Sequence, residues 1–167
     1  MIQIPIRAIA LLALLAQAAC SAITPPEVIQ DTTKVEVVKV DSTESVLARS
    51  RARWAAERPA TYDYTIRVSC FCGSEITRPV VVVVQDTTVV SRTYVDNGAA
   101  VPAVYVSIFP TIDGVFDVIA DAVAHKYAHV GVTYDPSLSY PTSIGLDVST
   151  SLVDDERVLT LTNFHAR

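Results

Sequence analysis

Apolar and polar residues alternate most regularly between Tyr62 and Cys70. The even positions of this stretch are apolar, whereas the odd positions, from Asp63 to Ser69, are polar. A period of two is typical of a β-strand that buries one face. Two valine-rich runs follow at Pro79–Val84 and Val89–Val95, and the short polar link between them predicts an antiparallel hairpin.

A helical pattern precedes each group of strands. Residues 41–44 have the residue types of a helix N-cap, and Pro59 ends the helix that they begin. A second helix begins after Pro110 with Thr111 as its cap, and its apolar residues recur every three or four positions. Three more strands are predicted at His129–Tyr134, Thr142–Val148 and Arg157–Phe164.

These elements predict an α+β fold over residues 41–167, in one domain. The expected order is helix, three strands, helix, three strands. Strands joined by short turns favour an antiparallel sheet, so we expect about six strands with both helices on one face. Trp54 and Phe116, which fall on the apolar sides of the two helices, are expected to pack against that sheet.

The first 19 residues have the layout of an export signal. Arg7 precedes the unbroken apolar run Ala8–Ala16, and small residues lead up to Cys20. The run is too short to span a membrane. Ala18-Ala19-Cys20 resembles a bacterial lipobox, although Gln17 stands where Leu is usual, and this predicts a lipidated Cys20 at the mature N-terminus. Cleavage after Ala18 is the alternative and would give a soluble periplasmic or secreted protein.

Residues 20–40 are predicted to hold the domain away from the membrane. Thr24-Pro25-Pro26 favours an extended, solvated backbone. Thr33–Val40 is β-branched and partly alternating, so an edge strand is the alternative there. Ser21, which follows the lipidated cysteine, resembles the signal for the outer membrane, with the domain facing the periplasm.

Composition excludes some classes of partner. Half of the residues are hydrophobic, which suffices for a core, and the formal net charge is −5 with a pI near 5.0. Nucleic acids require clustered Lys and Arg, so we expect no nucleic-acid partner. The expected membrane contact is the lipid on Cys20. A diacylated and N-acylated cysteine would anchor the protein stably, whereas a single acyl chain would not.

Cys70-Phe71-Cys72 is the most specific candidate for chemistry. Residues two apart on a strand have Cα atoms about 6.5–7 Å apart, near the upper limit for a disulfide. The pattern predicts a small disulfide or two packed thiols that shape the end of the strand. A strained redox pair or a soft-metal site is the alternative.

No other pattern predicts catalysis, a metal or a cofactor. His125 and His129 have a spacing that suits zinc, but Lys126 follows His125 where a zinc protease carries Glu. The sequence contains no Gly-x-Ser-x-Gly and no Ser-x-x-Lys, and only five glycines in all. We therefore expect a protein that is not an enzyme.

The segment from Tyr134 to Thr142 is a candidate interaction surface. Its tyrosines and prolines, together with Asp135, predict a rigid aromatic surface of the kind that interfaces favour, made by Tyr134, Asp135, Pro136, Tyr140 and Pro141. The alternative is that both tyrosines pack over the end of the sheet.

Five short motifs occur together and in this order: Trp54 with Pro59 and Tyr62; Cys70-Phe71-Cys72; Pro110-Thr111-Ile112-Asp113 with Phe116; Tyr134-Asp135-Pro136 with Tyr140-Pro141-Thr142; and Asp154-Asp155-Glu156. Over Ser45–Phe164 the chain thereby resembles a family of exported bacterial lipoproteins classed only as a domain of unknown function. The resemblance implies a location and a fold, and no activity.

The sequence thus predicts a lipid-anchored protein of the cell envelope that acts as a non-catalytic binding or structural module. Its sheet face or the Tyr134–Thr142 segment would contact an envelope protein or the cell wall. The alternative is a thiol-redox or metal-handling protein that uses Cys70 and Cys72.

Overall fold

The computed structural model describes residues 42–167. The predictions for residues 1–19, Cys20 and the rest of 20–41 lie outside this range. The described elements are, in chain order, α1 (Thr43–Glu57), β1 (Thr61–Ser69), α2 (Ser74–Thr77), β2 (Val80–Gln85), β3 (Thr88–Tyr94), the 3₁₀ helix η1 (Ala103–Ile108), α3 (Ile112–Ala124), β4 (His129–Tyr134), β5 (Pro141–Asp147) and β6 (Arg157–Ala166).

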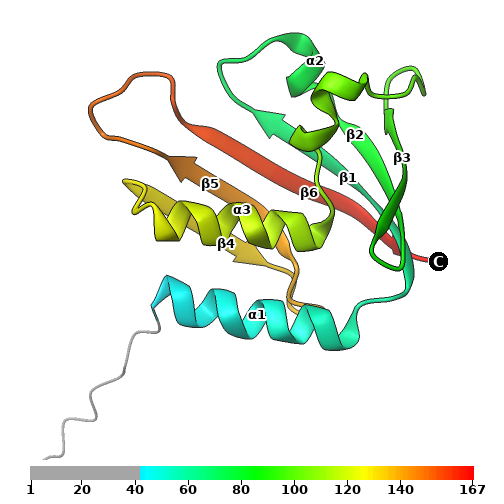
Figure 1. Ribbon diagram of the computed structural model, residues 1–167, viewed down its shortest axis with the longest axis horizontal. Helices are drawn as coiled ribbons and strands as arrows, with labels where there is room; N and C mark the ends of the chain where they lie inside the picture. Colours follow the sequence, from blue (N-terminus) through cyan, green and yellow to red (C-terminus); the bar gives the residue numbers. More distant parts are fainter. Residues whose placement is uncertain (1–41) are drawn as a thin grey trace, which may run out of the picture. The chain divides into compact units, whose positions relative to one another are not determined.

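The six strands form one open antiparallel sheet in the order β3-β2-β1-β6-β5-β4. The prediction of an α+β fold with an antiparallel six-stranded sheet is therefore confirmed. The first and last strands, β1 and β6, pair at the centre and join the two three-stranded groups. The two long helices, α1 and α3, lie against one face of this sheet (Figure 1).

The observed order differs from the expected one by two short helices. Both α2, with four residues, and η1, with six, are too short to produce a helical period in the sequence. Strand boundaries differ by one or two residues, and β6 runs to Ala166 rather than ending at Phe164. These are the positions where local patterns carry the least information.

Polar caps define where both long helices begin. The Ser42 side chain accepts a hydrogen bond from the Ser45 backbone N–H at 3.2 Å, and Thr111 accepts one from Gly114 at 3.1 Å. Each satisfies a backbone donor that has no partner inside the helix. Gly114 also allows a close approach, because a Cβ atom there would lie 2.8 Å from the Cβ of Pro110.

An aromatic cluster forms the core beneath the end of α1. Trp54 is completely buried, and its ring meets those of Tyr62, Tyr140 and Phe164 edge-on at centroid distances of 5.3, 5.8 and 5.9 Å. Tyr140 and Phe164 also stack on each other at 4.9 Å. These rings come from α1, β1, the residue before β5, and β6, so the cluster joins segments far apart in sequence.

Three β-bulges lie at this same end of the sheet. The register shifts between Asp63 and Thr65 where β1 meets β6, and similar shifts occur late in β2 and late in β4. The bulge in β6 contains Asn163, whose backbone is left-handed with φ 52°. Residues three apart on a regular strand face opposite sides of the sheet. Because the bulge adds one residue, Leu161 and Phe164 both face the core.

We expect Trp54→Ala to lower the free energy of unfolding by about 3–5 kcal/mol, because it removes the ring that all the others in the cluster contact. That loss is a large part of the stability of a typical domain. Urea unfolding followed by circular dichroism measures it. Val104→Ala, at a side chain that is 75 % exposed, is the matched control and should change stability by less than about 0.5 kcal/mol. Equal stability of the two variants would contradict this account of the core.

Candidate binding site on the uncovered face of the sheet

The polar positions of β1 point away from the face on which α1 and α3 pack. Tyr64, Ile66 and Val68 are buried in the core, whereas Arg67 and Ser69 between and after them are exposed. In β6 the core residues Leu159 and Leu161 alternate with Thr160 and Thr162 in the same way. The two central strands therefore present a polar surface on the side opposite these helices.

A hollow of about 470 Å³ lies on this polar surface. Residues with hydroxyl side chains, one asparagine and one arginine line it, together with two apolar residues. The lining residues are Thr65, Arg67, Ser69, Pro79, Val95, Thr160, Thr162 and Asn163. Six of these eight residues carry a hydrogen-bonding side chain, although apolar atoms make up most of the exposed wall.

Strand register sets the positions of these groups. Thr65 lies directly opposite Thr162, and Arg67 lies opposite Thr160. Thr160 in turn faces Ser143 of β5, so the polar row continues beyond β6. Within the hollow, the Asn163 amide donates to the Thr65 hydroxyl at 3.4 Å. The geometry is that of a rigid sheet, which positions side chains more firmly than a loop does.

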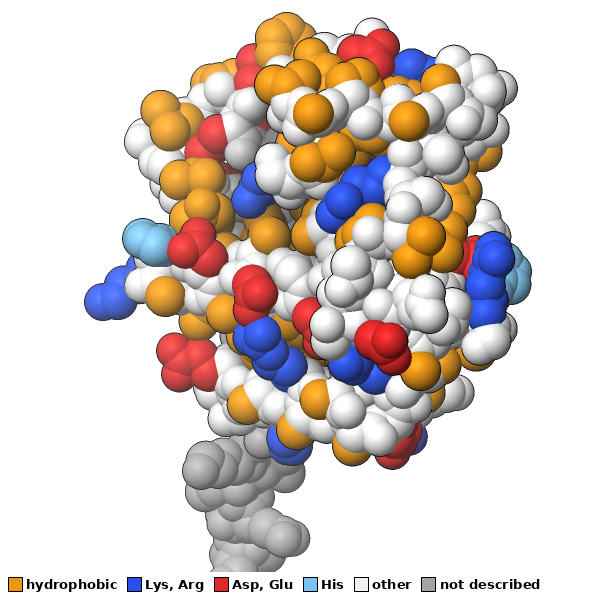
Figure 2. Space-filling view, turned by 45° about the vertical axis from the view of Figure 1, so that its right-hand side comes forward, with side chains coloured by type: hydrophobic (Ala, Val, Ile, Leu, Met, Phe, Trp, Pro, Cys, Tyr) orange, Lys and Arg blue, Asp and Glu red, His pale blue; other side chains and the backbone are white. Residues whose placement is uncertain are grey.

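Arg67 is the only charged residue in the wall of this hollow. No ion pair joins it to a carboxylate of residues 42–167. Other arginines of the described residues do form such pairs, as Arg51 does with Asp117 at 2.5 Å and Arg78 with Asp96 at 2.6 Å. Over α1, acidic and basic side chains lie side by side (Figure 2). The hollow thus has a cation without its counter-charge.

Asp63, further along the same face, already has partners. Its carboxylate accepts hydrogen bonds from Arg167 Nε at 2.5 Å and from His165 Nδ1 at 3.2 Å. Burial by itself would raise the pKa of Asp63, but the hydrogen bonds and positive charge of these two residues together hold the pKa below its ordinary value. The Arg167 N–H also donates to the Thr61 carbonyl at 2.9 Å, so the chain end is fastened to β1.

The predicted surface between Tyr134 and Pro141 is largely a packed corner. Tyr140 and Pro141 are buried, and Tyr134 is half-buried and stacks on Phe116 with centroids 6.4 Å apart. Asp135 accepts hydrogen bonds from the two backbone N–H groups of residues 137 and 138, and Pro136 is exposed. These contacts favour the packing alternative for Tyr140, and an interaction at this corner stays a prediction.

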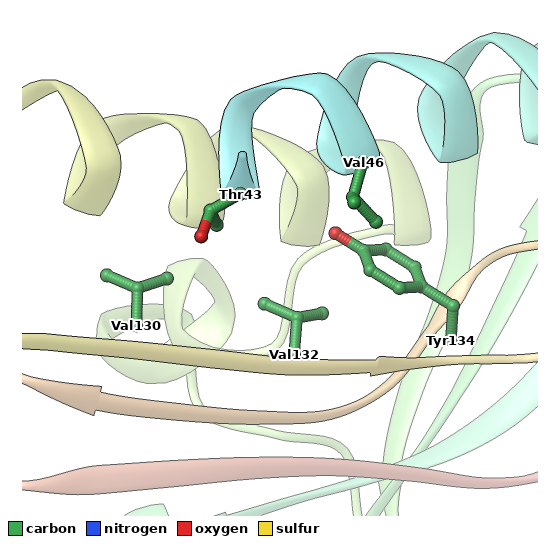
Figure 3. Close-up of a pocket in the computed structure, with 5 residues that line it drawn as sticks. All are labelled: Thr43, Val46, Val130, Val132 and Tyr134. Atoms are coloured by element: carbon green, nitrogen blue, oxygen red, sulfur yellow. The ribbon is translucent and has the colours of Figure 1, made fainter. Parts of the chain in front are cut away.

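A small apolar gap separates the first turns of α1 from β4. Thr43 and Val46 point from the helix toward the strand, and Val130, Val132 and Tyr134 point back toward it (Figure 3). The gap has a volume of about 160 Å³, and its walls are mainly apolar. Its polar groups are the hydroxyls of Thr43 and Tyr134, and no charged residue lines it, so we interpret it as an imperfection of packing.

Cys70 and Cys72 are joined by a disulfide with Cα atoms 5.2 Å apart. This spacing is shorter than that expected for a continuing strand, because β1 ends at Ser69 and the Cys72 N–H bonds the Cys70 carbonyl in a turn. Phe71 between them is 86 % exposed. The pair lies beside an apolar hollow bordered by Asp154, Asp155 and Glu156.

The histidines that suggested zinc do not lie in a cluster of ligands. His125 contacts Asp121 at 3.1 Å, and the His129 ring lies over Gly131. Within residues 42–167, no group of three or more His, Cys, Asp or Glu side chains is placed to hold a metal ion.

The sequence analysis named none of the residues of this hollow as site residues. The alternation between Asp63 and Ser69 assigned Thr65 and Arg67 to the polar face. Nothing in the sequence indicated that β6 pairs with β1, because this contact joins residues nearly a hundred positions apart. The hollow, which the two strands form together, was therefore missed as a site.

One family model matches most of the chain. The model, described as a family of unknown function (DUF6174), matches residues 46–166. No curated protein and no solved structure matches the chain. None of the helices in the described residues is both long and apolar enough to cross a membrane.

Replacing both Cys70 and Cys72 by Ala should lower the free energy of unfolding by about 1–2 kcal/mol, because the bridge closes a minimal loop and removes little unfolded-chain entropy. The measurement is urea unfolding in a Cys20→Ser background, with thiol titration of the unreduced parent protein. We expect no titratable thiol before reduction. Two titratable thiols in the unreduced, folded protein would favour the redox or metal alternative.

Asp63→Asn should lower stability at neutral pH by about 1–3 kcal/mol, since it weakens charge-assisted hydrogen bonds at a buried carboxylate. The folded-state pKa of Asp63 is lowered, so its stabilisation is present above the ordinary value and is lost as the pH falls through the folded pKa. The difference in the free energy of unfolding between the parent protein and the variant should therefore become smaller below about pH 4. Urea unfolding at pH 7, 5 and 3 measures it.

Asp117→Asn is the matched control for Asp63→Asn, because Asp117 also pairs with an arginine but both side chains are largely exposed. Its effect should stay below about 1 kcal/mol. If the loss of unfolding free energy in Asp63→Asn stayed the same between pH 7 and pH 3, the proposed ionic contribution would be contradicted.

Proposed function

We propose that this chain, which belongs to the DUF6174 family of unknown function, is an exported, lipid-anchored protein of the bacterial cell envelope. In this proposal it acts as a non-catalytic binding module. The uncovered face of its sheet contacts a component of the envelope, and the lipid on Cys20 holds it at the membrane, at the outer membrane facing the periplasm.

The number of cysteines supports the lipid anchor. The chain has three cysteines, and the disulfide between Cys70 and Cys72 uses two of them. Only Cys20 is left, directly after the small residues of the export signal. An unmodified thiol at that position would be exposed to an oxidising compartment, whereas acylation gives it a role.

The observation that carries the binding role is the hollow on the uncovered face of the sheet. Among residues 42–167, the long helices cover one side of the sheet and leave the other side open to a partner. That open side carries several polar side chains and, on its two central strands, one arginine that has no ion pair within those residues. Such a surface suits hydrogen bonding to a polar ligand rather than burial in a core.

The chemistry of this face supports binding more than catalysis. Its hydroxyls need a neighbouring base to become nucleophiles. The nearby carboxylate of Asp63 already accepts hydrogen bonds from Arg167 and His165, and it lies outside the wall of the hollow. What the hollow offers instead is a set of fixed donors and acceptors.

The thiol-redox or metal-handling role is the second candidate. The observation that favours it is the position of the disulfide at an exposed turn, with Phe71 protruding between the two cysteines. Exposed disulfides are more accessible to exchange than buried ones. The thiol titration described above separates the two candidates.

Both parts of the main proposal are tested with isolated cell envelopes. After a high-salt wash, the parent protein should stay with the membrane and Cys20→Ser should be released, because salt weakens a contact made by charged groups but not a lipid anchor. Added back to envelopes at low salt, the released protein should sediment with them, and a further Thr160→Trp change should abolish sedimentation by filling the hollow. Val104→Trp, at an exposed position outside the hollow, is the control for bulk. A Cys20→Ser protein that stays on the membrane through the high-salt wash would contradict anchoring, and unchanged sedimentation of the Thr160→Trp variant at low salt would contradict binding through this face.

A further inference from the structure

We propose that the hollow binds the carboxylate of a hydroxyl-rich ligand, a uronic acid residue of a polysaccharide, and that Arg67 is the group that binds the anion. This inference rests on the proposed function, because it names the ligand class of the same face. It assigns separate roles to the charged and the neutral residues of the hollow.

The charge of Arg67 points to an anion. Arg67 lines the hollow, and no ion pair joins it to a carboxylate of residues 42–167. Asp63, two positions beyond Thr65 on the same strand face, is held by Arg167 and His165 instead. The planar fork of an arginine matches the two oxygens of a carboxylate and binds them with two parallel hydrogen bonds.

The neighbours of Arg67 point to a ligand with many hydroxyl groups. Thr160 lies directly across from Arg67, and Thr65 and Thr162 form the next cross-strand pair. Each hydroxyl can donate one hydrogen bond and accept others, as sugar hydroxyls do. The Asn163 amide adds donors and an acceptor. The volume of about 470 Å³ falls within the usual range for small-ligand pockets, about 300–1,000 Å³, and suits a single sugar residue.

A carboxylate fits this site better than a phosphate does. Phosphate sites use backbone N–H groups at a helix N-terminus or in a turn, in addition to cations. The hollow lies on strands, where the backbone N–H groups of β1 and β6 belong to the pairing of the sheet. It has one arginine and no lysine. One planar cation and several neutral donors match a singly charged, planar anion.

The test uses the full chain with Cys20→Ser, and its probe is a trimer of galacturonic acid. Two-dimensional NMR would follow the backbone amides of β1 and β6 during titration. Three comparison ligands separate the chemistries: the methyl-esterified trimer lacks the charge, maltotriose is neutral, and glucose 6-phosphate carries a phosphate. We expect shifts at β1 and β6 with the acidic trimer, and binding at least tenfold weaker for the other three ligands.

Arg67→Gln should weaken binding of the acidic trimer ten- to a hundredfold, and Arg67→Lys should restore it in part, because lysine keeps the charge but not the fork. Arg157→Gln is the control for net charge. Arg157 is also exposed, but it falls at a core-facing position in the alternation of β6 and lies outside the hollow. Equal binding by Arg67→Gln and the parent, or an equal loss in Arg157→Gln, would overturn the proposal.

Stronger binding of glucose 6-phosphate than of the acidic trimer would also overturn the carboxylate assignment. Failure of this ligand assignment can be distinguished from failure of the proposed function. If envelopes retain the protein through a face that Thr160→Trp blocks, while the trimer does not bind, only the ligand class is wrong. If the trimer binds through Arg67 while envelopes do not retain the protein, the ligand site stands and the envelope role fails.

Discussion

The indole of Trp54 contacts aromatic rings from β1, β6 and the residue that precedes β5. No two of these partners come from the same strand, so the cluster forms only when α1, the first strand and the last strands have come together. Burial of these rings therefore requires both the pairing of β1 with β6 and the packing of α1 against them. The side of the sheet that holds the rings becomes the core side, and the opposite side is left polar.

The same constraint explains why the two faces of the sheet differ. Three bulges occur at the end of the sheet where Trp54 lies, and bulges increase the local twist of a strand pair. Twisted strands wrap around the aromatic rings on one side. On the other side the central strands present Thr65, Arg67 and Thr160, which face away from the core and are partly or largely exposed.

Local patterns predicted most of the fold, because the strands and long helices each bury one face. The period of two in β1 and the caps at Ser42 and Thr111 were readable without the structure. The pairing of β1 with β6 was not, since no local signal records a contact between distant strands. For the same reason the alternation in the sequence placed Arg67 on the polar face of β1, but it could not show that the threonines of β6 lie beside it.

The extra residue in β6 has a consequence for how this chain can change through insertion and deletion. Residues after Asn163 depend on it for the side of the sheet on which they fall: Phe164 in the core, His165 and Arg167 on the outer face with Asp63. Loss of one residue at this position would invert that assignment, placing charged groups against Trp54 and an aromatic ring in water. A substitution at Asn163 changes one side chain, whereas a change in length there moves every later side chain of β6 to the opposite face of the sheet.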